Sequence, residues 1–191
     1  MKAHYFLGLG VAEEVRDMIS QCASSWKKQG LAFKQWTQQE DYHITLHFFG
    51  GLEKSDLDFV QQSVESLSFN ERSITQQVKG LHYFGKPDSP RILWADPGTS
   101  PALKEVHKKV TESLADAGFS VEKRPFTPHI TIAKNWEGKE GCPLKKMEEE
   151  VLTMGEGLAW ECQYINLYQI HPGKRPKYEI IEQFPLETGA V

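Results

Sequence analysis

Two short segments of the sequence carry the same pair of chemically active side chains. His43 stands two residues before Thr45, and His129 stands two residues before Thr131. An unperturbed imidazole has a pKa of about 6.5, so histidine can give or take a proton near neutral pH. Two histidines in one site can therefore act as a general base on an attacking water and as a general acid on a leaving oxygen.

The residues around each pair have the alternation of a half-buried strand. Because strand side chains point to opposite faces in turn, each histidine shares a face with its threonine. The alternating positions are all large and aliphatic: Ile44 and Leu46 in residues 43–46, and Ile130 and Ile132 in residues 129–132. If the two strands face each other, one cleft receives two imidazoles and two hydroxyls.

This set of side chains suits the cleavage of a phosphodiester. Threonine hydroxyls can bind the phosphoryl oxygens, and the nearby cations Lys134 and Arg124 can offset the growing negative charge. When water is activated by a histidine, a strained cyclic phosphate needs no metal ion. The residue inventory therefore predicts a site without a metal or another cofactor.

The apolar periodicity of the chain predicts the elements that hold the two segments. Strands are expected at residues 4–10, 31–36, 43–49, 73–84, 91–95, 119–123, 129–132, 160–170 and 177–184. Helices are expected at residues 12–29, from a cap at Ser55-Asp56 to Leu67, from a cap at Ser100 with Pro101 in the first turn to a stop at Gly118, and at residues 143–152.

A strand–helix–strand order occurs twice, and each copy carries one histidine–threonine pair. We therefore predict an α+β fold for residues 1–191: a single bilobal domain with a duplicated architecture, antiparallel sheets that line a central cleft, and helices on the outside. No linker rich in glycine, serine or proline interrupts the chain, so the lobes are expected to pack tightly.

Composition restricts the partners of such a domain. The 191 residues carry a formal net charge of −4, whereas a protein that coats nucleic acid has a basic excess. A nucleic-acid substrate should therefore be engaged locally, at one phosphate or a few nucleotides. Three distant cysteines and the lack of any stretch of ~20 apolar residues predict a cytoplasmic monomer without a membrane anchor.

The wider sequence resembles the 2H phosphoesterase superfamily, and within it the bacterial and archaeal RNA 2′,3′-cyclic phosphodiesterases, historically called 2′-5′ RNA ligases. The matching segments follow one another in order at residues 43–50, 91–94, 124–134 and 178–186. The resemblance implies hydrolysis of RNA 2′,3′-cyclic phosphate ends to 2′-phosphomonoesters, with 2′-5′ joining as the reverse reaction. It implies that His43 is the proton donor and His129 the acceptor. Lys134 departs from the arginine more often found there, and lysine lacks the bidentate fork.

Three other functions remain open at this point. A phosphodiesterase for a small cyclic-phosphate or 2′-5′-linked nucleotide would use the same histidines, and a binding module would hold nucleotide or RNA ends without turnover. By strict alternation His47 also shares the face of His43, and with His129 it supplies the three imidazoles of a zinc hydrolase. The basic segment 174–177 is either a guide for RNA or a solvated turn. Phe48, Phe49, Trp94 and Trp136 are candidates for stacking on a base.

Overall fold

The computed structural model describes residues 2–67, 69–70 and 72–186, so residues 1, 68, 71 and 187–191 of the predicted domain lie outside the described ranges. The strands are β1 (His4–Gly10), β2 (Phe33–Trp36), β3 (His43–Gly51), β4 (Ile74–Gln77), β5 (Gly80–Lys86), β6 (Ser89–Asp96), β7 (Ile130–Trp136), β8 (Ala159–Cys162), β9 (Tyr164–Ile170) and β10 (Tyr178–Pro185). The helices are α1 (Glu13–Lys28), α2 (Lys54–Glu65), α3 (Pro101–Asp116), α4 (Leu144–Met154) and a 3-10 helix (Gln39–Asp41).

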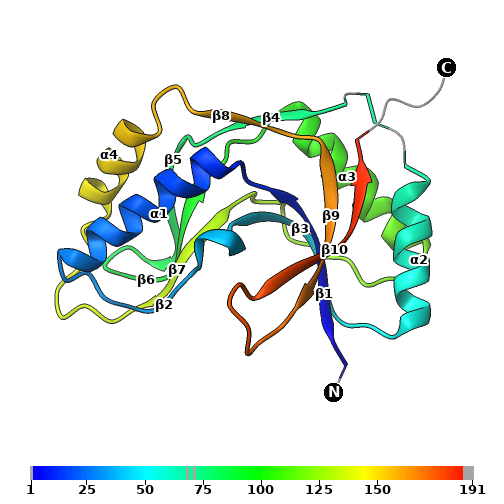
Figure 1. Cartoon of the computed structure of the whole chain (residues 1–191), viewed down its shortest axis with the longest axis horizontal. Helices are drawn as coiled ribbons and strands as arrows, with labels where there is room; N and C mark the ends of the chain where they lie inside the picture. The colour runs from blue at the N-terminus through cyan, green and yellow to red at the C-terminus, as the bar shows by residue number, and fades with distance from the viewer. Residues whose placement is uncertain (1, 68, 71, 187–191) are drawn as a thin grey trace.

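These strands form two antiparallel four-stranded sheets, one in each lobe (Figure 1). The strand orders are β10-β9-β1-β3 and β2-β7-β6-β5. Helices α2 and α3 pack together beside the first sheet, and α1 and α4 pack together beside the second. The predicted α+β fold with two lobes, antiparallel sheets and outer helices is therefore confirmed.

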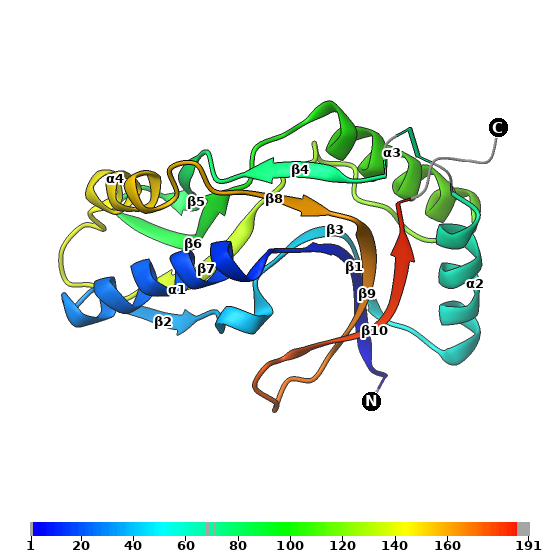
Figure 2. The ribbon, with the colours of Figure 1, turned by 45° about the horizontal axis from the view of Figure 1, so that its top comes forward.

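The lobes are interlaced along the chain. The first sheet combines β1 and β3 with the C-terminal strands β9 and β10, while β2 leaves the N-terminal half to pair with β7. A two-stranded ribbon of β4 and β8 also joins the lobes, because β8 leads from α4 on one side to β9 on the other (Figure 2). Each sheet thus draws strands from both halves of the sequence.

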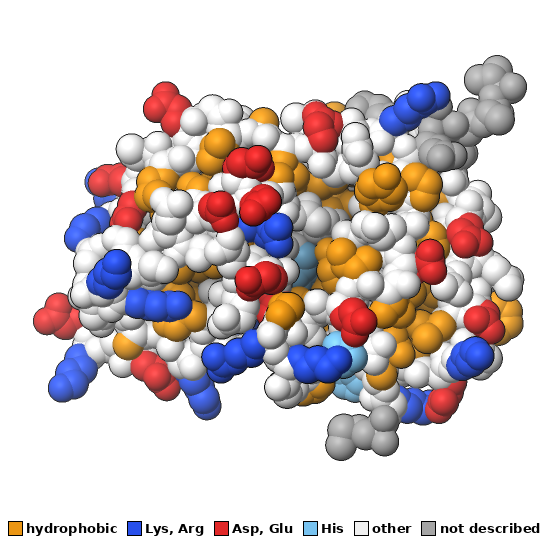
Figure 3. All heavy atoms as spheres, in the orientation of Figure 1, with side chains coloured by type: hydrophobic (Ala, Val, Ile, Leu, Met, Phe, Trp, Pro, Cys, Tyr) orange, Lys and Arg blue, Asp and Glu red, His pale blue; other side chains and the backbone are white. Residues whose placement is uncertain are grey.

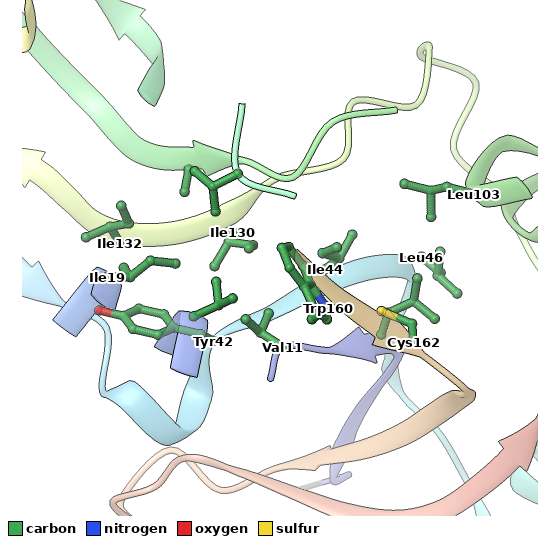
Figure 4. Close-up of a cluster of buried hydrophobic side chains, with 14 of the residues drawn as sticks. Val11, Ile19, Tyr42, Ile44, Leu46, Leu103, Ile130, Ile132, Trp160 and Cys162 are labelled. Carbon is green, nitrogen blue, oxygen red and sulfur yellow. The ribbon is translucent and has the colours of Figure 1, made fainter. Parts of the chain in front are cut away.

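The aliphatic faces of the two histidine-bearing segments meet in the core. Ile44 on β3 and Ile130 and Ile132 on β7 are fully buried. Figure 4 shows them in one apolar cluster with Tyr42 and Trp160. The inward direction predicted for these residues is confirmed, and it holds β3 and β7 together at the junction of the lobes.

Most helix ends follow the predicted signals. The hydroxyl of Ser100 accepts a hydrogen bond from the amide of Leu103 at 3.1 Å, and Gly118 has a φ of +88°. Helix α2 instead begins at Lys54, because the Asp56 carboxylate accepts from the amide of Glu53 at 2.8 Å. Among the described helices, none is long and apolar enough to cross a membrane.

The strand predicted at residues 119–123 does not form. Phe119 and Val121 carry the apolar alternation that suggested it, and both are packed against the core. These side chains are therefore partly buried although their backbone is not paired in a sheet. Apolar alternation alone does not distinguish such a segment from a strand.

Gly8 on β1 lies so close to β3 that it leaves no room for a side chain. A Cβ added there would lie 2.7 Å from the carbonyl oxygen of Ile44, whereas a Cβ on Gly10 would meet the Asn166 side chain at an ordinary 3.5 Å. Gly8 lies beside Thr45 in the strand register, so it keeps β3 close to β1 at the paired histidine and threonine.

We predict that Gly8→Ala lowers the free energy of unfolding by about 1–3 kcal/mol, because the backbone of β3 must shift. Gly10→Ala is the matched control on the same strand and should leave this free energy unchanged or slightly raised. Urea denaturation followed by circular dichroism measures both, and equal stability of the two variants would contradict the close approach.

Candidate active site

His43 begins β3, and its ring is held from both sides. Its Nδ1 lies 2.7 Å from the carbonyl oxygen of Asp41, and its Nε2 lies 3.0 Å from Oγ1 of Thr45. Because a carbonyl oxygen only accepts, Nδ1 must carry the hydrogen. In the neutral ring Nε2 is therefore the basic nitrogen, and the Thr45 hydroxyl donates to it.

His129, directly before β7, is held in the same way. Its Nδ1 lies 2.8 Å from the carbonyl oxygen of Thr127, again two residues earlier in the chain. The rings of Phe84 and Trp94 stand edge-on to it, with centroids 5.2 and 5.8 Å away. The two segments thus present two imidazoles of the same tautomer, each with Nε2 as its basic nitrogen.

Both histidines line a single cleft of about 390 Å³, within the range of small-ligand sites. Thr45, Thr131 and Lys134 line it with them. The other lining residues are Phe6, Gln35, Trp36, Thr37, Gln38, Asp41, Phe48, Ile92, Ile170, Pro172, Lys174, Arg175, Lys177 and Tyr178. Figure 3 shows lysine or arginine side chains next to histidine side chains near the middle of the face in view.

The cleft disfavours further positive charge. Burial lowers the pKa of His43 to about 4, the charges of His129 and Lys134 add to this, and the hydrogen bond to the Asp41 carbonyl opposes it. Burial likewise lowers the pKa of His129, with a further contribution from Lys134. The pKa of Lys134 is itself lowered by burial and then by Lys177. A bound anion would stabilise the protonated forms and so oppose these shifts in pKa, which suits the cleft to a phosphate.

Arg124 is not among the residues that line the cleft. Its guanidinium is exposed, and Nη2 lies 2.6 Å from a carboxylate oxygen of Glu122. Residues 119–123, directly before Arg124, do not form the predicted strand, and the arginine pairs with an acid two residues earlier. The structure thus brings five of the six predicted site residues together and leaves Arg124 apart.

His47 is also absent from the cleft, because a β-bulge breaks the alternation of β3. Gly8 pairs with Thr45 and Leu7 with His47, so Leu46 is an extra residue on β3. His47 is therefore buried on the opposite face, where its ring lies 4.6 Å from that of Phe49 and burial lowers its pKa. The three-histidine zinc site required His47 beside His43, and this geometry overturns it.

The bulge also decides which aromatic residue reaches the cleft. Phe48 lines the cleft and is 57% exposed. Trp94 contributes its edge to His129, while Nε1 of Trp136 donates to the carbonyl of Glu140 at 2.9 Å. Of the aromatic candidates for base stacking, Phe48 alone is among the residues described as lining the cleft.

Several cleft residues were not singled out from the sequence. The rings of Phe6 and Tyr178 lie 4.6 and 5.0 Å from that of His43, and Asp41 also lines the cleft. Asp41 had one sequence signal, since it precedes its histidine by two residues as Thr127 precedes His129. The basic segment 174–177 had been noted, and Lys174, Arg175 and Lys177 line the cleft.

Two facing His-x-Thr segments in one cleft between antiparallel sheets define a 2H phosphoesterase. The family model of the 2′-5′ RNA ligase superfamily matches residues 15–173, and the chain belongs to this superfamily. The resemblance seen in the sequence is therefore confirmed.

Relatives in other organisms support the same assignment. Two proteins named RNA 2′,3′-cyclic phosphodiesterase are similar to this chain over 97% of its length: one from Bacillus subtilis at 31% identity and one from Geobacillus stearothermophilus at 32%. The chain covers 98% of the first relative and 58% of the second.

Solved structures share the fold. The chain is similar to a Thermus thermophilus protein with a TM-score of 0.76 at 19% identity, over 98% of this chain and 100% of that one. It is also similar to LigT of E. coli complexed with 3′-AMP, with a TM-score of 0.73 at 14% identity, over 97% and 99%. At these identities the likeness establishes the architecture.

The lowered pKa of His43 makes stability depend on pH. A histidine whose pKa falls on folding stabilises the folded state fully above its unfolded pKa of about 6.5, and this contribution is lost as pH falls through about 4. We predict that between pH 6.5 and 4 wild type loses up to about 3 kcal/mol more unfolding free energy than His43→Gln. Urea denaturation at pH 7, 5.5 and 4 measures this, and parallel losses in the two proteins would contradict it.

Proposed function

We propose that this chain hydrolyses RNA ends bearing a 2′,3′-cyclic phosphate to 2′-phosphomonoesters, as an RNA 2′,3′-cyclic phosphodiesterase. The observation that carries the proposal is the pair of imidazoles in one cleft, each with Nδ1 bonded to a backbone carbonyl and Nε2 left to exchange a proton. The shared name of the Bacillus and Geobacillus relatives supports RNA as the substrate class.

In this reaction water attacks phosphorus while Nε2 of His129 takes its proton. The bond from phosphorus to the 3′ oxygen breaks, and Nε2 of His43 gives its proton to that oxygen. The bound phosphate monoanion raises the pKa of a nearby imidazole and so favours the protonated form that the donor requires. The bond that forms between phosphorus and the water oxygen replaces the bond that breaks, and the two proton transfers balance the charges.

The remaining polar groups bind the phosphate. When His43 is protonated, the Thr45 hydroxyl no longer donates to Nε2 and is free to donate to a non-bridging oxygen, as Thr131 does from the other strand. Lys134 offsets the charge that develops on these oxygens. The reverse reaction, joining through a 2′-5′ linkage, would use the same groups, but it requires a second RNA end in the place of water.

We predict that His43→Ala and His129→Ala each lower kcat/KM by at least about 10²-fold, because each removes one proton transfer. The assay follows conversion of a short RNA with a 2′,3′-cyclic phosphate end to a 2′-phosphate end, in EDTA. His4→Ala is the control, since His4 is an exposed histidine that does not line the cleft.

Three outcomes would redirect the proposal. Bound RNA without conversion indicates a binding module, and conversion of 2′,3′-cyclic mononucleotides but not of the RNA indicates a small-substrate phosphodiesterase. Loss of wild-type turnover in EDTA indicates a metal-dependent reaction.

The pKa directions also predict the pH profile. The free protein governs kcat/KM. Burial lowers the pKa of His43 to about 4 and also lowers the pKa of His129, so the form with a protonated His43 and a neutral His129 becomes scarce once the pH rises above both values. We therefore expect kcat/KM to be greatest below pH 6.5 and to fall about tenfold per unit on the alkaline side. The kcat profile should lie at higher pH, because bound phosphate raises both pKa values. A kcat/KM maximum above pH 7.5 would contradict this electrostatic description.

A further inference from the structure

Asp41 is a buried carboxylate that joins two distant parts of the chain. It is the last residue of the 3-10 helix before β3, and only 5% of its surface is exposed. Its Oδ1 accepts from the amides of Lys177 at 2.9 Å and Tyr178 at 3.0 Å, and its Oδ2 accepts from Lys177 at 3.0 Å. A charge buried to this degree is costly unless it is hydrogen-bonded, so these bonds hold the start of β10 firmly to the 3-10 helix.

The backbone of the same residue holds His43. The carbonyl oxygen of Asp41 accepts the Nδ1 hydrogen of that imidazole at 2.7 Å. Any movement of Asp41 therefore moves the acceptor that sets the tautomer and direction of the ring. Thr127 supplies the equivalent carbonyl to His129, but in the described residues its side chain makes no comparable bond to a distant segment.

The segment that the carboxylate anchors is the cationic loop 171–177 between β9 and β10. The amide of His171 donates to the carbonyl of Lys177 at 2.8 Å, which closes the loop. Lys174, Arg175 and Lys177 line the cleft. None of the ion pairs in the described part of the chain involves Asp41. Because backbone amides satisfy this acid, it is not ion-paired with any of the three cations, and their side chains can turn to an anionic ligand.

We propose that Asp41 is a positioning residue that sets His43 and the cationic loop in one geometry, so that the loop binds phosphates of the RNA strand leading to the cyclic end. This inference rests on the proposed function and extends it from a single cyclic phosphate to an oligonucleotide. The Asp41 carboxylate anchors the loop through its backbone amides, and the Asp41 carbonyl oxygen orients the His43 imidazole. Both groups belong to one residue at the end of the short 3-10 helix.

The test is Asp41→Asn, which keeps the size of the side chain but replaces one acceptor oxygen with an NH₂ group that opposes a backbone N–H. We expect kcat to fall about 10-fold or more for both an RNA oligonucleotide and a 2′,3′-cyclic mononucleotide, because His43 is less well held. KM should rise severalfold for the oligonucleotide alone, because only the longer substrate reaches the displaced loop. A merely structural role would lower kcat for both substrates and leave both KM values unchanged.

Asp17→Asn is the matched control. The Asp17 carboxylate accepts from the Gln39 side chain, at the start of the same 3-10 helix, and does not line the cleft with the histidines. Its kinetic constants should stay within about twofold of wild type, since this bond contacts neither histidine nor the cationic loop and a single side-chain hydrogen bond contributes little net stability. Equal effects of the two substitutions would overturn the proposal.

A second measurement does not depend on turnover. In wild type the amides of Lys177 and Tyr178 should be protected from hydrogen exchange and the Nδ1–H of His43 should give an observable NMR resonance; in Asp41→Asn both should be lost. Fast exchange of these amides in wild type overturns the proposal even if Asp41→Asn does not fold. If wild type hydrolyses none of the substrates, the proposed function fails, and these signals still decide the role of Asp41.

Discussion

The packing of β3 against β7 determines where both histidines lie. Each strand turns aliphatic side chains inward, and Ile44, Ile130 and Ile132 are fully buried between the lobes. Burial of one such side chain contributes about 1.5–3 kcal/mol, so the same contact that stabilises the core also sets the separation of the two sheets. Because strand faces alternate, a shift of register by one residue would bury the histidines and expose the isoleucines. Core and cleft are therefore opposite faces of one pair of strands.

The electrostatics of the cleft follow from this placement. Histidines attached to core strands are partly removed from water, and burial is the first cause of the lowered pKa at both positions. A carbonyl two residues before each ring then selects its tautomer, with Asp41 serving His43 and Thr127 serving His129. The free protein thus holds two neutral imidazoles near cationic groups, and an anionic substrate is what makes protonation of one of them favourable.

Local patterns predicted much of this arrangement, because it depends on neighbours in the sequence. Alternation placed His43 with Thr45, apolar periodicity located the helices, and Ser100 and Gly118 marked the ends of α3. Pairing between segments that are distant in the sequence cannot be predicted from such local patterns. The bulge that removes His47 from the cleft depends on the register of β3 against β1.

The same limit applies to other residues of the site. The amides that Asp41 binds lie 136 and 137 positions further along the chain. Arg124 was expected in the cleft because it lies near His129 in sequence, but a local acid pairs with it instead. The interlacing of the lobes likewise depends on the order of the strands in each sheet, which cannot be predicted from a short segment of the sequence.

Under the proposed function, the distribution of charge favours recognition of RNA ends over recognition of long RNA. The chain as a whole is acidic, with a formal net charge of −4, yet Lys134, Lys174, Arg175 and Lys177 all line the cleft. At physiological ionic strength charges interact over roughly 8 Å, so the cations act on those phosphates of the strand that lie within the cleft, while distant phosphates meet a surface with more acids than bases. Lys134 acts there as a point charge without the fork of an arginine, and orientation of the phosphate then depends on the two threonines. Attraction is thus confined to the few nucleotides that enter the cleft, where the two imidazoles are held.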